Sequence, residues 1–214
     1  LSEGHWDAQV ASWGKRMVAR PHRPDQLTLR ESYLSALQSG QLDAQRKKRW
    51  QKSEKYAGWL SEAMLPGLSM EQANSLYRAS GGRQHKDFTG NPIEEIKDSL
   101  DFLLYDTIKL ESRFDECVSP EGAYQLAGAS KGFVSYLLCL REPRLFGLWN
   151  NQAERALRVL GLYPETLSKG HWGLRYIDLL DALQVVRVQM GLANFQEVDQ
   201  FAYWLARSGW RVAQ

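Results

Sequence analysis

Apolar residues recur along the chain at the spacing of helical faces. Between residues 5 and 19, Trp6, Val10, Trp13 and Met17 stand at i, i+4, i+7 and i+11, which places them on one stripe of a helix. Similar periods follow one another to the end of the chain, and the alternation typical of strands is nearly absent. We therefore expect an all-α helical bundle. Its helices are predicted over 5–19, 27–40, 42–64, 70–79, 92–114, 120–127, 131–141, 150–160, 173–190 and 195–207.

Turn and capping residues mark the ends of these helices. The segment PHRP at 21–24 interrupts the first pattern. Ser69 directly precedes the helical segment MEQANSLYRA and is suited to cap it. Asn91-Pro92 and Ser119-Pro120 each combine a capping residue with a proline that fits the first helical position.

The longest loop-like stretch, SGGRQHKDFTGN at 80–91, holds three glycines and a basic centre. We interpret it as a hinge. It divides the chain into a basic helical part, 1–90, and a second helical part, 91–214, and these two subdomains are expected to surround a cleft.

Charge is unevenly distributed although the net charge is only +2. Eleven Lys or Arg and four acids lie between residues 15 and 55, whereas eight acids and three bases lie between 94 and 116. The basic third favours a polyanionic partner, and a solvated helix face is the alternative. Two cysteines, Cys117 and Cys139, make neither a disulfide framework nor a metal quartet, which is typical of a reducing cytoplasm. No apolar run approaches a membrane span, so we expect a cytoplasmic protein without a membrane partner.

The segment LAGASKGFVSYLL at 126–138 is suited to hold a phosphate. Gly128 permits a tight turn between two helices, and Ser130 can cap the second one. The first amides of a helix have no partner inside it and carry partial positive charge, which favours an anion. With Lys131 beside them, Gly128 and Ser130 can position a DNA backbone without reading its bases.

Together with LWNNQAERALRVLGL at 148–162, this hairpin resembles the helix-hairpin-helix DNA glycosylase superfamily. Members carry a Leu-Pro-Gly-hydrophobic-Gly hairpin, an apolar helix, a Val-Asp-Thr-type turn and a helix ending in Leu-Gly-hydrophobic. The match covers about 40 residues, under a fifth of the 214. The matching positions are Leu126, Gly128, Ala129, Val134, Leu137, Trp149, Asn150, Asn151, Glu154, Arg155, Leu160 and Gly161.

The resemblance has three departures that bear on chemistry. Ser130 replaces the second glycine of the hairpin. Gly132 stands near the catalytic lysine of bifunctional members and Lys131 is one place away, so the resemblance implies a monofunctional hydrolase rather than a lyase. Asn150 occupies the place of the catalytic Asp, whose charge it cannot carry. Either another carboxylate replaces that Asp, or the protein binds DNA without cutting the glycosidic bond.

Asp199, in the aromatic segment FQEVDQFAYWL, is the carboxylate that we expect as the substitute. Near aromatic walls it can stabilise a cationic sugar. The alternative for Asp199 is a structural one, as a helix cap or the partner of an arginine.

The expected base pocket combines aromatic and amide side chains. Trp149, Trp172 and Tyr176 can stack on a flipped base, while Asn150 and Asn151 can hydrogen-bond its edge or a phosphate. Core packing is the alternative for the aromatic residues, and helix capping is the alternative for Asn150.

The loop that holds Arg78, Arg83, His85 and Lys86 is expected to cross phosphates or to fill the gap left by a flipped base. A solvated loop is the alternative. The four histidines are scattered and no four-cysteine cluster exists, so we expect no metal and no cofactor.

Three functions from different classes are therefore carried forward. The first is a DNA glycosylase that binds duplex DNA, flips a modified or damaged base and hydrolyses its N-glycosidic bond, with the hypermodified bases of phage DNA among the targets. The second is a non-catalytic DNA-binding module of a modification-dependent restriction or antiviral defence system. The third is a helical protein-interaction domain.

Overall fold

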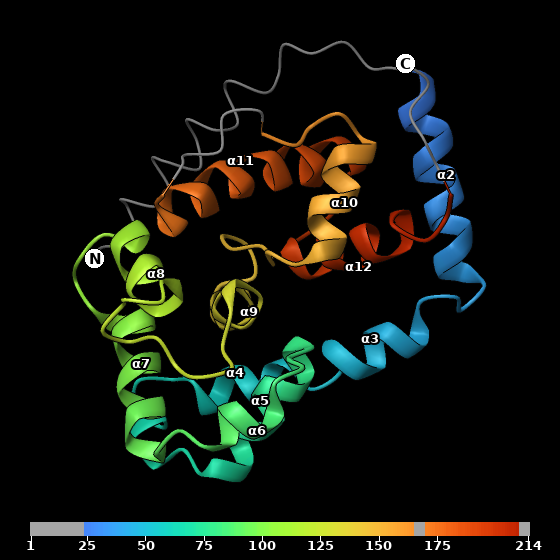
Figure 1. Cartoon of the computed structure of the whole chain (residues 1–214). Coiled ribbons are helices and arrows are strands. Elements are labelled where there is room, and N and C mark those ends of the chain that lie inside the picture. The colour runs from blue at the N-terminus through green and yellow to red at the C-terminus, as the bar shows by residue number, and fades with distance from the viewer. Residues whose placement is uncertain (1–23, 165–169, 210–214) are drawn as a thin grey trace.

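The computed structural model describes residues 24–164 and 170–209, and within these ranges the regular structure is entirely helical. The expected all-α fold is confirmed, while the helix predicted at 5–19 lies outside the described residues. The elements, shown in Figure 1, are α2 (Pro24–Gln38), α3 (Asp43–Arg49), α4 (Ser53–Trp59), the 3-10 turn η1 (Leu65–Gly67), α5 (Met70–Ser80), α6 (His85–Thr89), α7 (Ile93–Tyr105), α8 (Leu110–Val118), α9 (Lys131–Arg141), α10 (Asn151–Val159), α11 (Trp172–Met190) and α12 (Phe195–Leu205).

Helix α9 lies at the centre of the bundle, where Figure 1 views it nearly end-on. Every residue from 133 to 140 is buried. Because a helix that is apolar on all sides has to be enclosed, the remaining helices gather around α9. It packs against α4, α5 and α8.

Two long helices predicted from the apolar period are each divided. The 42–64 segment forms α3, α4 and a turn, because the buried Trp50 at the end of α3 turns its indole inward. The 92–114 segment forms α7 and α8. Between them the Asp106 side chain accepts a hydrogen bond from the Ile108 amide, at 2.9 Å, and so competes with the helical pattern.

The helix predicted at 120–127 is absent, and this segment forms turns instead. Gly122 approaches α8 so closely that an added Cβ would lie 2.1 Å from the Glu116 carbonyl oxygen. The amides of Ala123 and Tyr124 both donate to Glu116. The hairpin at 126–131 therefore has a helix only on its C-terminal side.

The predicted caps are partly correct. Ser69 begins α5 with a capping box in which Gln72 is the second member. Asn91 does not cap α7, whose N-cap is Pro92. Instead the Asn91 side chain is buried and holds the Ala127 backbone, which it contacts through both a donor and an acceptor.

The predicted hinge at 80–91 contains the short helix α6. Its Phe88 ring stacks on Tyr77 of α5, with centroids 4.2 Å apart, and both rings contact Phe133 of α9. Buried residues on both sides of position 90 belong to one core cluster. The division into 1–90 and 91–214 stays a prediction.

No helix among the described residues is both long and apolar enough to cross a bilayer. Both cysteines are buried and unpaired.

Candidate functional site: a buried carboxylate beneath a basic surface

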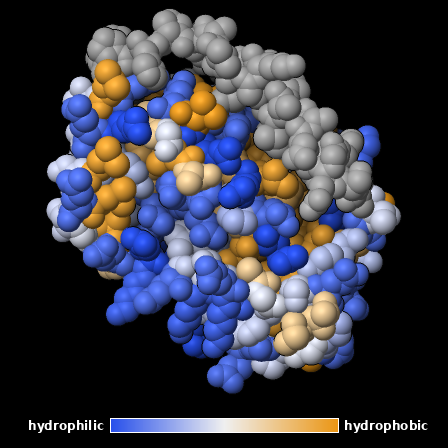
Figure 2. All heavy atoms as spheres, turned by 180° about the vertical axis from the view of Figure 1, so that it is seen from behind, coloured by the Kyte–Doolittle hydropathy of each residue, from blue (hydrophilic) through white to orange (hydrophobic). Residues whose placement is uncertain are grey.

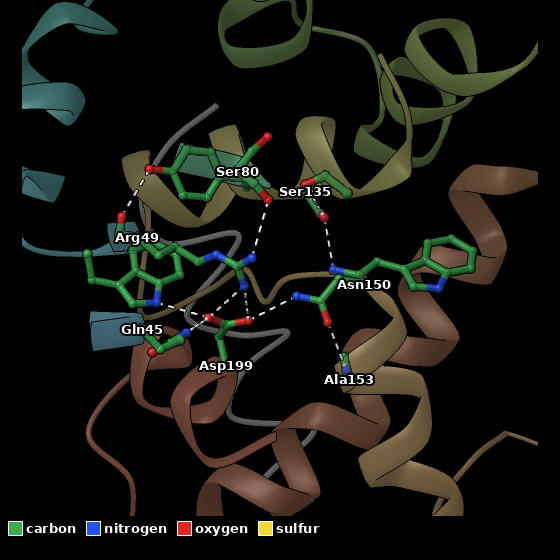
Figure 3. Close-up of polar contacts among 11 residues, drawn as sticks. Gln45, Arg49, Ser80, Ser135, Asn150, Ala153 and Asp199 are labelled. Atoms are coloured by element: carbon green, nitrogen blue, oxygen red, sulfur yellow. Dashed lines mark hydrogen bonds and ion pairs between the residues drawn. The ribbon is translucent and has the colours of Figure 1, made fainter. Parts of the chain in front are cut away.

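Asp199, in the first turns of α12, is a buried carboxylate at which several helices meet (Figure 3). Its side chain is 1% exposed and forms an ion pair with Arg49, with 2.9 Å between Arg49 Nη1 and Asp199 Oδ1. Oδ2 accepts further hydrogen bonds from Gln45 Nε2 at 2.9 Å and Trp50 Nε1 at 3.0 Å. All three donors come from the α3 region, so Asp199 anchors that region to α12.

Asn150 completes the set of partners around Asp199. Its Nδ2 donates to Asp199 Oδ1 at 3.0 Å, while its Oδ1 accepts from the Ala153 amide and caps α10. The structure thus brings together the two residues that the sequence analysis singled out for catalysis. Both Asp199 oxygens are engaged by donors, which is the arrangement expected of a structural carboxylate that compensates its burial with hydrogen bonds.

Arg49 extends this network to α5. Its Nη2 donates to the carbonyl oxygen of Ser80, the last residue of α5, at 3.5 Å. The backbone carbonyl of Arg49 accepts from the Tyr136 hydroxyl of α9 at 3.2 Å. One arginine therefore contacts α12, α5 and α9.

The hairpin packs on α5 and α6 but is not covered by them. Gly128 has φ +74°, and an added Cβ would lie 2.8 Å from both Gln84 O and Phe88 N. Tyr77 donates its hydroxyl to Gly128 O at 2.7 Å. Ser130 is exposed and stands at the N-cap of α9 without a side-chain capping bond. Residues 128–131 are therefore partly accessible to solvent.

Lys131 points to an internal carboxylate. Its Nζ lies 2.5 Å from Glu154 Oε1 and 4.4 Å from the centroid of the Trp149 ring. The Trp149 indole N–H also donates to Glu154, at 2.7 Å. Burial opposes ionisation of Glu154, but the hydrogen bonds from Lys131 and Trp149 outweigh it and lower the Glu154 pKa.

The expected base pocket is occupied by core packing in this structure. Trp149 and Tyr176 are fully buried, and Tyr176 stacks on Phe114 with centroids 4.2 Å apart. Trp172 is half-buried beneath Arg175, and Asn151 is exposed. A flipped base could reach Trp149 or Tyr176 only if helices separated, so their stacking role stays a prediction.

Exposed basic side chains cluster in two groups beside this network. We define the cationic surface as Arg46, Lys47 and Lys48 on α3 together with Arg78, Arg83 and Lys86 in the α5–α6 region; all six are exposed. The Arg49–Ser80 contact joins the two groups. Figure 2 shows strongly hydrophilic side chains projecting at the lower left, where α3 lies when the molecule is seen from behind.

Gln45, Arg49 and Trp50 were not predicted as site residues, and Glu154 was named only as a position that matches the resemblance, without a role. The Asp199 partners on α3 are about 150 residues away along the chain, so no local pattern links them. For Glu154 a local signal existed, because Arg158 is four residues further on and pairs with it.

No group of three or more His, Cys, Asp or Glu side chains in the described ranges is arranged to hold a metal ion. Comparisons with protein-family models, curated proteins and solved structures gave no match, so the function is inferred from this geometry.

Proposed function

We propose that this protein binds duplex DNA through the sugar-phosphate backbone. The observation that carries the proposal is the cationic surface, in which six exposed Lys and Arg side chains come from two segments, 46–48 and 78–86, that the Arg49–Ser80 contact links. A surface on which cations outnumber acids favours a polyanionic partner. In complexes of proteins with DNA, contacts to the phosphate backbone supply much of the affinity. Two exposed acids, Asp43 on α3 and Asp87 on α6, accompany the six cations, so positive charge is in excess on these segments.

The hairpin at 128–131 adds a backbone contact next to this surface. Gly128 packs against the α6 segment that carries Lys86, and the exposed Ser130 leads into α9. Free amides at the start of α9 favour a phosphate, which would set the position of the duplex.

Base excision is the second candidate, and the contact between Asn150 and Asp199 is the observation that favours it. Hydrolysis would require Asp199 to exchange a donor for a sugar or a water molecule, and its side chain is 1% exposed. The geometry therefore supports DNA binding better than catalysis, which agrees with the DNA-binding module of a modification-dependent defence system.

Fluorescence anisotropy with a labelled duplex of about 20 base pairs, titrated at several salt concentrations, tests the binding proposal. If each of the six cations neutralises one phosphate, log K falls against log salt with a slope of about −5, since each phosphate contributes about −0.9. Lys47→Ala is expected to weaken binding, whereas the matched removal of Lys97, which pairs with Glu94 on α7, leaves it unchanged. Absence of salt-dependent binding at low salt refutes the proposal and leaves the protein-interaction domain.

Excision is tested on the same preparation. Duplexes with uracil, oxidised, alkylated or glucosylated bases are incubated with the protein and then treated with alkali, which cleaves abasic sites. Strand breaks that disappear with Asn150→Ala support the glycosylase, and binding without breaks supports the non-catalytic module.

A further inference from the structure

The buried contacts of α3 determine the direction in which its exposed cations point. Gln45 and Arg49 are four residues apart, so they lie on one face of α3, and both contact Asp199. The intervening Arg46, Lys47 and Lys48 consequently point outward, where they are exposed. Any rotation of α3 about its axis would therefore redirect all three cations at once.

The same guanidinium also contacts the backbone between Arg78 and Arg83, which belong to the second group of cations. Arg49 Nη2 reaches the Ser80 carbonyl, and an added Cβ on Gly81 would lie 3.0 Å from this nitrogen. Gly81 has φ +88° and ends α5, so the chain turns there toward Arg83. Arg49 therefore lies between the segment that carries Lys48 and the segment that carries Arg83.

Only arginine can make both contacts in this way. Its planar guanidinium holds donors in a fixed fork, whereas lysine has a single charged nitrogen. The Arg49 side chain is 16% exposed, so it is available mainly to its internal partners rather than to a ligand. Asp199 fixes Nη1 with two short contacts and leaves Nη2 directed at Ser80.

We infer that Arg49, held by Asp199, is a positioning residue that sets the spacing between the two groups of the cationic surface so that both meet the backbone of one duplex. This inference rests on the proposed DNA binding. It assigns the buried ion pair to DNA recognition without any contact between Asp199 and DNA.

Arg49→Lys is the test, because it keeps the charge and removes the fork. The readouts are the affinity for the labelled duplex and the slope of log K against log salt, with circular dichroism to verify the fold. If wrong spacing costs one phosphate contact, the slope becomes shallower by about 0.9. This corresponds to about eightfold weaker binding at 0.1 M salt. Ser99→Ala, which removes a buried hydrogen bond to Tyr124 O elsewhere in the core, is the matched control and should bind like the unaltered protein.

The outcomes separate the inference from the proposed function. A folded Arg49→Lys variant with lower affinity and a shallower slope supports the positioning role, since a role in stability alone would leave the slope unchanged. If Arg49→Lys does not fold, Asp199→Asn, which has nearly the same shape, is measured in its place. Wild-type affinity and slope in the folded variant overturn the inference while DNA binding stands. Failure of the unaltered protein to bind at low salt removes both.

Discussion

Replacing Asp199 with alanine should destabilise the fold strongly, whatever the protein binds. The substitution removes the acceptor for Gln45, Arg49, Trp50 and Asn150 in one step. The Arg49 side chain, which is only 16% exposed, then carries a positive charge without a carboxylate partner. Breaking a buried ion pair from one side costs about 3–5 kcal/mol, because the remaining charge stays desolvated.

The neutral donors add to this cost and water reduces it. Each buried donor that loses its partner costs about 1–3 kcal/mol, and water that enters the space of the lost carboxylate recovers part of that. If this water offsets the cost of the three neutral donors, the cost of the broken ion pair remains, and the free energy of unfolding falls by about 4 kcal/mol. For a protein of this size that corresponds to a Tm lower by about 8–16 °C.

Urea unfolding followed by circular dichroism measures this change, with an unaltered m-value showing that the same surface is exposed on unfolding. Asp101→Ala, which removes an exposed carboxylate on α7, is the control and should stay within about 0.5 kcal/mol of the unaltered protein. The double variant Arg49→Met with Asp199→Leu should lose less than the sum of the single losses, because no unpaired charge remains. A loss below about 1 kcal/mol in Asp199→Ala would refute the assignment of Asp199 as a structural anchor.

Three further predictions concern other parts of the molecule. Because the pKa of Glu154 is lowered in the fold, its carboxylate stabilises the protein above the unfolded-chain pKa, and this contribution is lost as pH falls through the folded pKa; Glu154→Gln should therefore flatten the acid side of a stability–pH curve measured by urea unfolding. Burial raises the pKa of Cys117 to about 12, so Ellman's reagent at about pH 8 should modify it only after urea unfolds the chain, and rapid labelling of the native protein would contradict this burial. Gly173→Ala should lower the free energy of unfolding by about 3 kcal/mol or more, because the new Cβ would lie 1.7 Å from the Glu111 carbonyl oxygen where α11 crosses α8. Gly58→Ala, with no atom within 4 Å of its added Cβ, should instead be neutral or stabilising when both glycine variants are compared by urea unfolding.

Local signals in the sequence were sufficient for only some of the features made by neighbouring residues. Ser69 caps α5 as predicted, and helix capping, the alternative given for Asn150, is also observed. Asn91, Ser119 and Ser130 carry the same kind of signal but make no side-chain cap.

The break at Asp106 was missed, since the apolar period continues through it. In the structure the Asp106 side chain accepts a hydrogen bond from the Ile108 amide at this point. Similarly, the predicted helix at 120–127 has acceptable residues but lies where the chain must approach α8.

The candidate site could be predicted only in part, because its contacts join residues that are far apart in the sequence. The unusual position of Asp199, an acid among aromatic residues, was visible in the sequence, and Asn150 was selected independently. That they touch, and that Arg49 neutralises Asp199, depends on packing between helices remote in sequence. Arg78, Arg83 and Lys86 are exposed, but Arg78 lies in α5 and Lys86 in α6 rather than in the predicted loop. Burial of Trp149 follows from tertiary contacts that no local pattern contains.

The enclosure of α9 has a consequence for how the molecule opens. Because Phe133 to Leu140 are covered on every side, the amide hydrogens of this helix can meet solvent only when the surrounding helices come apart together. Deuterium uptake in α9 would then report the free energy of global unfolding, and the hairpin that leads into it would exchange much earlier. The exchange rate of the innermost helix therefore measures the stability of the whole bundle.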